Sequence, residues 1–443
     1  MRGLLDPDVW VVDLTPLKVN DQYRLLFAGR LISTFALGML MVVLTVQTYD
    51  LTDSSLQVAL VNTVLGLSTL VGSFIGGVLA DRVDRRRVIL VSRALAVVGF
   101  VALAVNAAFP EPSVAVLYLF AVWDGVTGAA GAAAFGAAVP AVVEPAMLPA
   151  TGALMALSVD LGAAASPLVA GLLAGYGSQG LVYWAVAGVS GISWLLLVRL
   201  RPLPPDGGGP GAAPIAEGLA GWGADLVEGV TFAGREPVVA VVLVLGFLQI
   251  LLASPHVLIP ELVEGTIGGG PQDVGLIFSA TSVGALVATT ASGWVPRVRR
   301  VGVVLGVVLL LGSLGIAAFG LAPTIVLAVS AMFFVGACDV IAEILRFTIL
   351  AERTPDRLRG RVQSLWSAQV TVGDSLGGPL LSLVARGVGV PFAIAAGGLL
   401  AAAGTAVLLT RPALRTLVRD PESSGALSGD PPELGEPRPP TTA

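Results

Sequence analysis

The sequence predicts an all-α membrane protein with twelve transmembrane helices in two pseudo-symmetric halves of six. Composition is the first reason: hydrophobic residues make up 55% and charged residues 12% of the 443 residues, and the mean hydropathy is +0.88. A transmembrane helix takes about 20 apolar residues, so the chain has enough for about twelve. The other two reasons are loops of alternating charge and a proline- and glycine-rich stretch that separates the first six hydrophobic segments from the last six.

The hydrophobic segments follow one another in order, and each is long enough to cross a bilayer as a helix. The N-terminal half, 24–199, is predicted to cross at 24–49, 55–80, 86–108, 113–140, 147–174 and 178–199. The C-terminal half, 237–411, is predicted to cross at 237–260, 273–295, 300–322, 324–349, 362–385 and 389–411.

The other parts of the chain are predicted to lie outside the membrane. Residues 1–23 carry Asp6, Asp8 and Asp13 before any apolar run, unlike a cleavable signal peptide, and are expected to form a cytoplasmic segment. Residues 200–236 are a cytoplasmic linker that starts with the Pro/Gly-rich stretch 201–214. An amphipathic helix on the membrane surface follows it, because apolar residues recur at helical spacing at Ile215, Leu219, Trp222, Leu226 and Val230. Residues 412–443 have little apolar surface to bury, so we expect a disordered cytoplasmic tail.

Arginines concentrate in every second loop. They are Arg82, Arg85, Arg86, Arg87, Arg199, Arg201, Arg235, Arg297, Arg299, Arg300, Arg353, Arg357, Arg359 and Arg361. The intervening loops are acidic or neutral, with Arg386 as the exception, and the loop after the fourth segment carries Glu144 without a base. Because basic loops stay in the cytoplasm, we expect a multi-pass protein of the inner (cytoplasmic) membrane with both termini cytoplasmic.

Few side chains are available for metal, redox or nucleophilic chemistry. The single cysteine, Cys338, and the single histidine, His256, exclude a disulfide within the chain and a structural zinc site. The single lysine, Lys18, has no glycine-rich turn before it, so ATP hydrolysis by a P-loop is excluded. We therefore expect neither an enzyme nor a resident metal or cofactor.

The two halves look related to each other. A proline, a leucine, a glycine and a second proline follow one another in both, as Pro145, Leu148, Gly162 and Pro167 and as Pro355, Leu358, Gly373 and Pro379. Two related six-helix halves are typical of secondary transporters, whose substrate site lies between them near the middle of the membrane.

The sharpest motif lies at the end of the second segment, where residues 76–87 read GGVLADRVDRRR. It resembles the loop motif of the major facilitator superfamily, with Asp84 in place of a glycine and with matches at Gly77, Leu79, Ala80, Asp81, Arg82, Arg85 and Arg86. The resemblance implies a cytoplasmic latch, in which Asp81 binds the N-terminal end of a helix that starts near Arg361. The alternative is that the arginines only anchor the topology.

A second motif lies in the fifth segment, where residues 162–171 read GAAASPLVAG. It resembles the antiporter motif of the same superfamily at Gly162, Pro167 and Gly171, with a serine and an alanine in place of two glycines. Small residues allow helices to pack closely, and proline bends a helix. The motif favours export over import, and ordinary packing in an alanine-rich helix is the alternative.

Three further stretches extend the resemblance: 106–113 (NAAFPEPS), 117–125 (LYLFAVWDG) and 365–374 (LWSAQVTVGD). They are similar to the siderophore exporters of enteric bacteria within the superfamily, and the similarity covers about residues 24–411. The resemblance implies a monomeric, proton-driven transporter that exports a catecholate-like siderophore from the cytoplasm by alternating access. Its partners would be this small molecule, protons and the bilayer, with no nucleic acid. A drug or antibiotic efflux pump of the same fold is the alternative.

Ionisable residues inside the predicted helices are candidates for proton coupling or for the substrate cavity, because such residues are costly in a membrane. They are Arg30, Asp124, Asp160, His256, Asp339, Glu343, Arg346 and Asp374. Asp339 and Glu343 share a helix face at i, i+4, and Glu343 and Arg346 can pair at i, i+3. Such carboxylates can load and release protons in an antiporter, and a structural charge network is the alternative.

The other candidates differ in how they are interpreted. Asp124 faces a cavity or binds a neighbouring helix, and Asp160 is a second candidate for proton coupling. Asp374 is expected to line the cavity. Arg30 either reaches back to the cytoplasm along its apolar stem or attracts an anionic substrate. A lone histidine such as His256 is more often a packing residue than a proton carrier.

Overall fold

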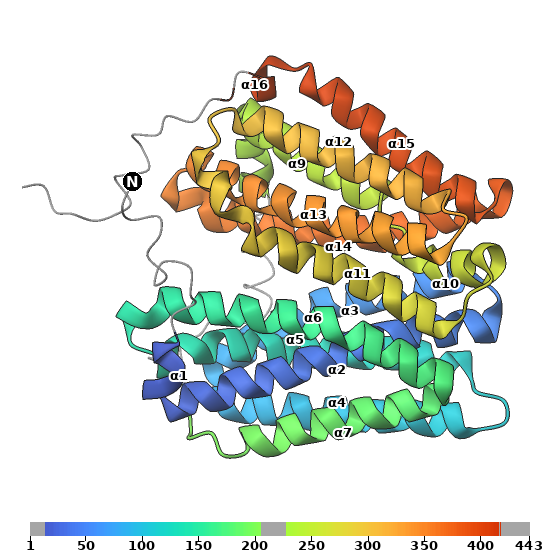
Figure 1. Cartoon of the computed structure of the whole chain (residues 1–443). Coiled ribbons are helices and arrows are strands. Elements are labelled where there is room, and N and C mark those ends of the chain that lie inside the picture. The colour runs from blue at the N-terminus through green and yellow to red at the C-terminus, as the bar shows by residue number, and fades with distance from the viewer. Residues whose placement is uncertain (1–13, 205–226, 416, 418–443) are drawn as a thin grey trace, which may run out of the picture.

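The computed structural model describes residues 14–204, 227–415 and 417, and the regular elements within these ranges are all helical (Figure 1). The N-terminal half contains α1 (Thr15–Val19), α2 (Asp21–Thr52), α3 (Ser55–Arg82), α4 (Arg85–Ala108), α5 (Val114–Val142), η3 (Pro145–Met147), α6 (Leu148–Tyr176) and α7 (Gln179–Leu197). The C-terminal half contains α9 (Pro237–Leu252), η4 (His256–Leu258), α10 (Ile259–Leu262), η5 (Val263–Ile267), α11 (Pro271–Thr290), η6 (Ser292–Arg297), α12 (Val301–Gly320), α13 (Ile325–Arg353), α14 (Asp356–Val388), α15 (Val390–Leu409) and α16 (Pro412–Arg415).

The predicted membrane fold is confirmed. Eleven helical segments in the described ranges are long and apolar enough to cross a bilayer. The predicted eleventh span corresponds to α14, which has 33 residues and packs against α3, α9 and α15 but carries charged residues along its length. Its charged first turns and Asp374 explain why composition alone does not mark it as a span, although it completes the set of twelve long segments.

Polar residues fix several helix starts. The Asn20 side chain accepts hydrogen bonds from the backbone N–H groups of Gln22 and Tyr23 at the start of α2, both at 3.0 Å. Ser178 caps α7 by accepting from the Leu181 N–H at 3.2 Å. These side chains satisfy N–H groups that have no partner within the helix, so each helix begins at a defined residue.

The predicted span 237–260 differs from the structure. The helix is interrupted at Ala253–Pro255 and resumes through η4, α10 and η5 as far as Ile267. Pro255 has no backbone N–H to donate and its ring clashes with the preceding turn, which accounts for the interruption. Non-helical backbone at membrane depth is tolerated only where it is buried in protein or lines a cavity.

Among the described residues, the two halves share a hydrophobic core at one end of the bundle only. There, one continuous cluster joins residues of the N-terminal half, such as Val43 and Leu103, with residues of the C-terminal half, such as Leu258 and Phe319. At the other end, which carries α1 and α16, each cluster stays within one half, with two in the N-terminal half and one in the C-terminal half. We call these the far end and the terminal end. The ribbons of the two halves diverge towards the terminal end (Figure 1).

Direct contacts between the halves agree with this arrangement. The Thr63 hydroxyl of α3 donates to the Ser375 carbonyl of α14 at 2.8 Å. The Arg386 guanidinium donates to the Ser54 hydroxyl at 3.0 Å. These hydrogen bonds join the far-end portions of α3 and α14, so the structure is closed at the far end.

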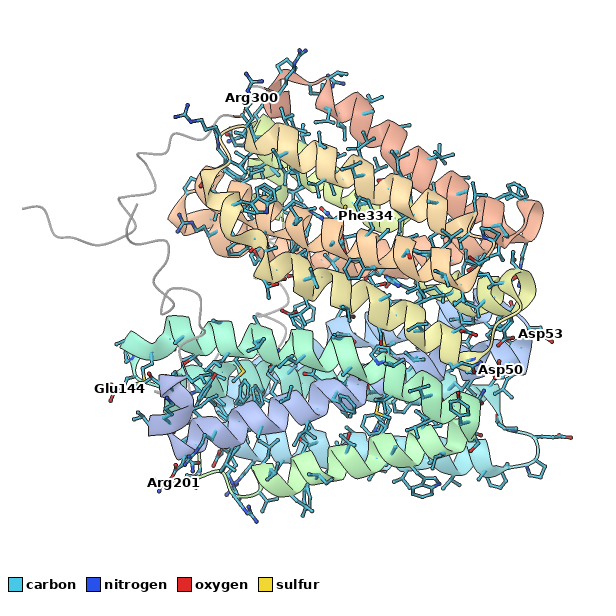
Figure 2. All side chains as sticks on the ribbon, viewed as in Figure 1. Asp50, Asp53, Glu144, Arg201, Arg300 and Phe334 are labelled. Carbon is cyan, nitrogen blue, oxygen red and sulfur yellow. The ribbon has the colours of Figure 1, made fainter. Side chains whose placement is uncertain are left out.

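Charged side chains also differ between the two ends. Figure 2 shows Arg201 and Arg300 at the terminal end and Asp50 and Asp53 at the far end. Glu144, the acidic exception in the sequence pattern, lies at the terminal end as well.

Some predictions fall outside the described residues. They concern residues 1–13, the tail 418–443 and most of the predicted amphipathic helix, of which the structure describes only a helical segment at 227–235. The division of the chain into 1–23, 24–199, 200–236, 237–411 and 412–443 stays a prediction.

Candidate functional site

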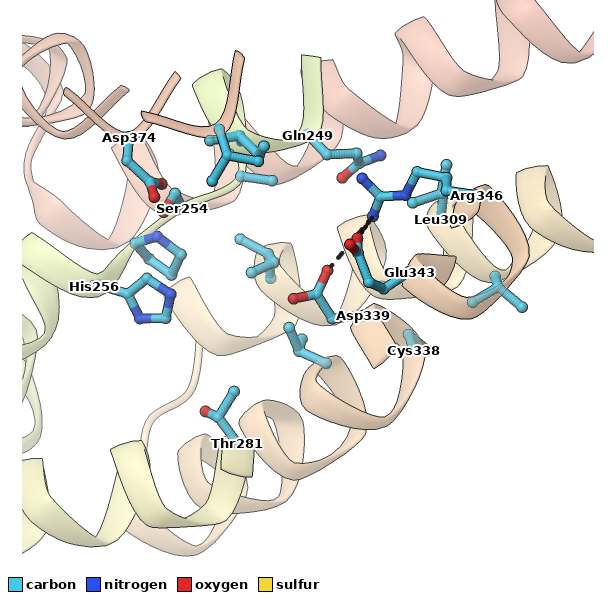
Figure 3. Close-up of a pocket in the computed structure, with 18 of the residues that line it drawn as sticks. Gln249, Ser254, His256, Thr281, Leu309, Cys338, Asp339, Glu343, Arg346 and Asp374 are labelled. Atoms are coloured by element: carbon cyan, nitrogen blue, oxygen red, sulfur yellow. Dashed lines mark ion pairs between the residues drawn. The ribbon is translucent and has the colours of Figure 1, made fainter. Parts of the chain in front are cut away.

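The C-terminal half contains a cavity of about 650 Å³ between α9, α11, α12, α13 and α14 (Figure 3). Apolar side chains, among them Met332 and Val335, form part of its wall. Most of its polar lining comes from α13, α14 and the interrupted segment after α9, and Gln249 of α9 and Thr281 of α11 add to it. A few polar groups in a largely apolar wall are typical of small-molecule sites.

The first polar group in the cavity is a charged cluster on α13. Arg346 Nη2 lies 3.9 Å from Asp339 Oδ1 and 4.0 Å from Glu343 Oε2. The Arg346 side chain is only 4% exposed, whereas the Asp339 and Glu343 side chains are 77% and 53% exposed. The guanidinium carbon lies 4.9 Å from the centre of the Trp366 ring of α14, a cation–π distance. The buried cation is therefore held by an aromatic ring and two accessible carboxylates.

The second polar group lies where α9 is interrupted. The Asp374 carboxylate of α14 faces the Ser254 hydroxyl and the His256 ring (Figure 3). The His256 ring is exposed to the cavity and stacks on Phe278 of α11, with 5.8 Å between ring centres. The break in the helix thus places a hydroxyl and an imidazole beside a carboxylate from a different helix.

The structure brings five of the predicted residues into this cavity: His256, Asp339, Glu343, Arg346 and Asp374. The other three lie in the N-terminal half. Arg30 of α2 is half-buried, with its guanidinium carbon 5.6 Å from the centre of the Phe135 ring. Asp124 is buried in α5, and Asp160 is half-buried in α6.

Asp124 has a charged neighbour that sequence analysis missed. Arg93 of α4 lies close enough for their opposite charges to interact, and Arg30 lies close enough to repel Arg93. Arg93 is the ninth residue of α4, six positions beyond the arginine run that starts the helix, and so looks like another residue that reaches the membrane surface. The available signal was its position inside the predicted span 86–108, where an ionisable residue is costly.

The loop motif lies at the terminal end, where Asp81 is exposed and makes no hydrogen bond or ion pair with the described residues. Arg361 lies in the helix end that Asp81 is predicted to bind. It instead forms an ion pair with Glu228 of the linker, at 2.5 Å. Gly77 has open space around it, whereas Gly72 and Gly76 pack against α5. The latch is thus not formed in this conformation, and it stays a prediction.

The rest of the motif joins the linker to the bundle. Asp84 Oδ1 accepts hydrogen bonds from the N–H of Arg86 at 2.9 Å and from the N–H of Leu203 at 3.0 Å. Arg86 Nη2 donates to the Val198 carbonyl at 2.8 Å. The aspartate that replaces the family's glycine therefore caps α4 and holds the start of the linker.

The fifth-segment motif lies where α6 packs between α2 and α11. A Cβ added at Gly162 would lie 2.9 Å from the Thr34 side chain of α2. One added at Gly171 would lie 2.9 Å from the Gly275 Cα of α11, and the Pro167 carbonyl also contacts Gly275. Close backbone approach here joins the two halves near the far end.

Comparison with known proteins identifies relatives along the whole chain. A sequence model of a major facilitator family, described as "Transmembrane secretion effector", matches residues 12–433. The chain is 34% identical over 421 residues to Enterobactin exporter EntS of Escherichia coli O157:H7, which covers 95% of this chain and 99% of that protein. It is also 34% identical over 413 residues to Enterobactin exporter EntS of Escherichia fergusonii, covering 93% and 97%.

Solved transporter structures share the fold. The peptide transporter POT in complex with sulfate matches with a TM-score of 0.72 at 15% identity, covering 90% of this chain and 96% of that one. The nucleoside transporter NupG matches with a TM-score of 0.67 at 14% identity, covering 88% and 98%. At these identities the likeness is one of fold alone.

Proposed function

The chain belongs to the major facilitator family described as transmembrane secretion effectors, and we propose that it exports a catecholate siderophore from the cytoplasm by proton antiport. It is a membrane transporter and not an enzyme, because its relatives and its structural neighbours are transporters. The observation that carries the proposal is the 34% identity to Enterobactin exporter EntS over 95% of the chain. Similarity of this extent includes both halves of the chain.

The distribution of charge supports an orientation. Arginines lie in the loops of the terminal end, and Asp50 and Asp53 lie at the far end (Figure 2). Basic loops stay in the cytoplasm, so the terminal end is the cytoplasmic one and both termini lie there. The far end faces outward from the inner membrane.

The arrangement of the halves supports alternating access. They share a core only at the far end, so this conformation is closed to the outside and accepts substrate from the cytoplasm. Export then requires the halves to rock about the cavity until the terminal end closes, with Asp81 as the latch.

The two polar groups of the cavity support a division of roles. Asp374, with Ser254 and His256, carries the proton, because a carboxylate beside an imidazole can accept and pass on a proton. The cluster of Asp339, Glu343 and Arg346 faces the substrate. A proton that enters from the outside and leaves to the cytoplasm gives transport its direction.

Deletion of the gene tests the proposal in cells grown without iron. Mass spectrometry would quantify siderophore and its precursors inside the cells and in the medium. We expect the external pool to fall and the internal pool to rise, and a plasmid copy of the gene to restore both. Unchanged pools together with greater sensitivity to antibiotics would overturn siderophore export in favour of drug efflux.

A further inference from the structure

Arg346 has hydrogen-bond donors that the protein does not use. A guanidinium has five N–H donors. Within the described part of the chain, the structure records one hydrogen bond for this residue, from Nε to the Ala342 carbonyl at 3.4 Å. The two carboxylates at 3.9 and 4.0 Å attract the charge but lie beyond hydrogen-bond distance. The remaining donors lie at the wall of the cavity.

A buried charge with unused donors is costly unless something binds it. Arg346 is 4% exposed, so water reaches little of it. The Trp366 ring lies against the guanidinium and restricts its orientation. A planar guanidinium held in this way binds two neighbouring oxygens of an anion through two parallel hydrogen bonds.

We propose that Arg346 is the specificity-determining residue of the cavity and that its guanidinium binds a pair of adjacent oxygens, one of them negatively charged, on an aromatic substrate. This inference rests on the proposed export of a catecholate siderophore. A catechol that has lost one proton to a neighbouring base or to water offers such a pair, an oxyanion beside a hydroxyl, and its ring can pack beside Trp366. In the ferric complex the same oxygens bind iron, so Arg346 selects the iron-free molecule.

Asp339 and Glu343 compete with the substrate for Arg346. Both carboxylates flank Nη2 and both are accessible from the cavity, so an incoming anion meets their negative charge before it reaches the guanidinium. In the empty transporter they stabilise the buried cation. When substrate binds, its oxygens replace this long-range attraction with direct hydrogen bonds.

Binding to the purified full-length protein in lipid nanodiscs tests the inference, with iron-free and ferric enterobactin as probes in a titration calorimeter. Arg346→Lys keeps the charge but loses the paired donors. Hydrogen bonds to charged groups contribute about 1.5–3 kcal/mol, so we expect affinity for the iron-free probe to fall about 10- to 100-fold. Binding of the ferric complex is expected to be weak and the same in both proteins. Equal affinity of wild type and Arg346→Lys for the iron-free probe would overturn the assignment.

A second pair of variants leaves Arg346 intact and guards against misfolding. Asp339→Asn and Glu343→Gln remove the competing charges, so we expect each to bind the iron-free probe more tightly than wild type. Weaker or unchanged binding in both would contradict the competition. If the wild type binds neither form, the proposed substrate fails. In that case 2,3-dihydroxybenzoate replaces enterobactin as the probe of the anion site. The assignment of Arg346 requires that Arg346→Lys lose binding of this probe. An Arg346→Lys variant that still binds it as wild type does would overturn the assignment.

Discussion

Asp374 is the carboxylate best placed to carry a proton, because the interruption of α9 puts Ser254 and His256 beside it. An amide of the same shape cannot exchange a proton. We therefore expect Asp374→Asn to reduce gradient-driven transport in proteoliposomes to the rate measured without a gradient. Exchange of labelled for unlabelled substrate should persist, since the cavity keeps its size and its arginine.

The control for this prediction is Asp339→Asn, which removes a carboxylate from the same cavity but from the arginine cluster. It should leave the response to a pH gradient intact. If Asp374→Asn still responds to the gradient while Asp339→Asn does not, Asp339 rather than Asp374 carries the proton, and the proposed division of roles is wrong.

At the residue level, the sequence indicates which side chains to consider but not which of them meet. Asp339, Glu343 and Arg346 could be grouped in advance because their spacing puts them on one face of one helix. Asp374 and His256 could not, because they lie on different segments and meet only through the break at Ala253–Pro255. Arg93 was missed because it follows a run of arginines at a helix start, and the charge of Asp124 in the next helix is what identifies it.

Among the helices, α6 and α11 form the closest contact between the halves, at Gly171 and Gly275. A Cβ at Gly275 would clash with the Pro167 carbonyl and lie 2.7 Å from the Gly171 Cα. Overpacking of a tight contact costs about 1–3 kcal/mol, so we expect Gly275→Ala to lower the thermal unfolding temperature in detergent.

Gly188→Ala is the matched control for Gly275→Ala. Gly188 also lies inside a transmembrane helix, α7, but an added Cβ there meets open space. Alanine favours a helix over glycine by about 1 kcal/mol, so this change should leave the unfolding temperature unchanged or raise it. Equal unfolding temperatures for the two variants would contradict a close interhelical contact at Gly275.

Most of the helices are well predicted by hydrophobicity, since a membrane-spanning segment needs about 20 predominantly apolar residues, and α14 with its charged residues is the exception. The predicted 113–140 corresponds to Val114–Val142, and 389–411 to Val390–Leu409. The interruption of α9 was not predicted, because Pro255 and Pro260 lie in a segment whose hydropathy stays high. Hydropathy indicates whether a segment is stable in lipid. An interruption of the helix depends instead on which backbone hydrogen bonds can form, and proline removes one of them.

The two halves also place cation–π pairs at matching depths. Phe135 of α5 and Arg346 of α13 stand the same distance from the ends of two helices that are both 29 residues long. In one half the ring receives Arg30 from α2, and in the other the arginine receives Trp366 from α14. The two contacts are not repeats of each other, however, because α2 is the first long helix of its half whereas α14 is the fifth long helix of the other.

Across the whole molecule, the linker and the latch motif share one residue. Arg361 pairs with Glu228 in this conformation, and Gly229 lets the linker approach the Arg361 backbone closely. If Asp81 binds this region when the terminal end closes, loss of Glu228 favours closure. A half-exposed ion pair contributes about 0–1 kcal/mol, so we expect Glu228→Gln to shift the balance by up to about fivefold.

The single native cysteine reports this shift, because Cys338 lies in the wall of the cavity. Alkylation by a maleimide added at the cytoplasmic face should slow in Glu228→Gln and recover when Asp81→Asn is added, since the second change removes the latch. An unchanged rate in Glu228→Gln, or no recovery in the double variant, would contradict the exchange of partners.

The most direct test of proton-driven siderophore export uses purified protein in vesicles oriented with the cytoplasmic end outward. Iron-free enterobactin is added outside, and its accumulation is followed with an acidic lumen and with equal pH on both sides. We predict accumulation against a concentration gradient only when the lumen is acidic, and collapse of that accumulation by a protonophore. Uptake that is independent of the pH gradient, or no uptake at all, would contradict the proposed function.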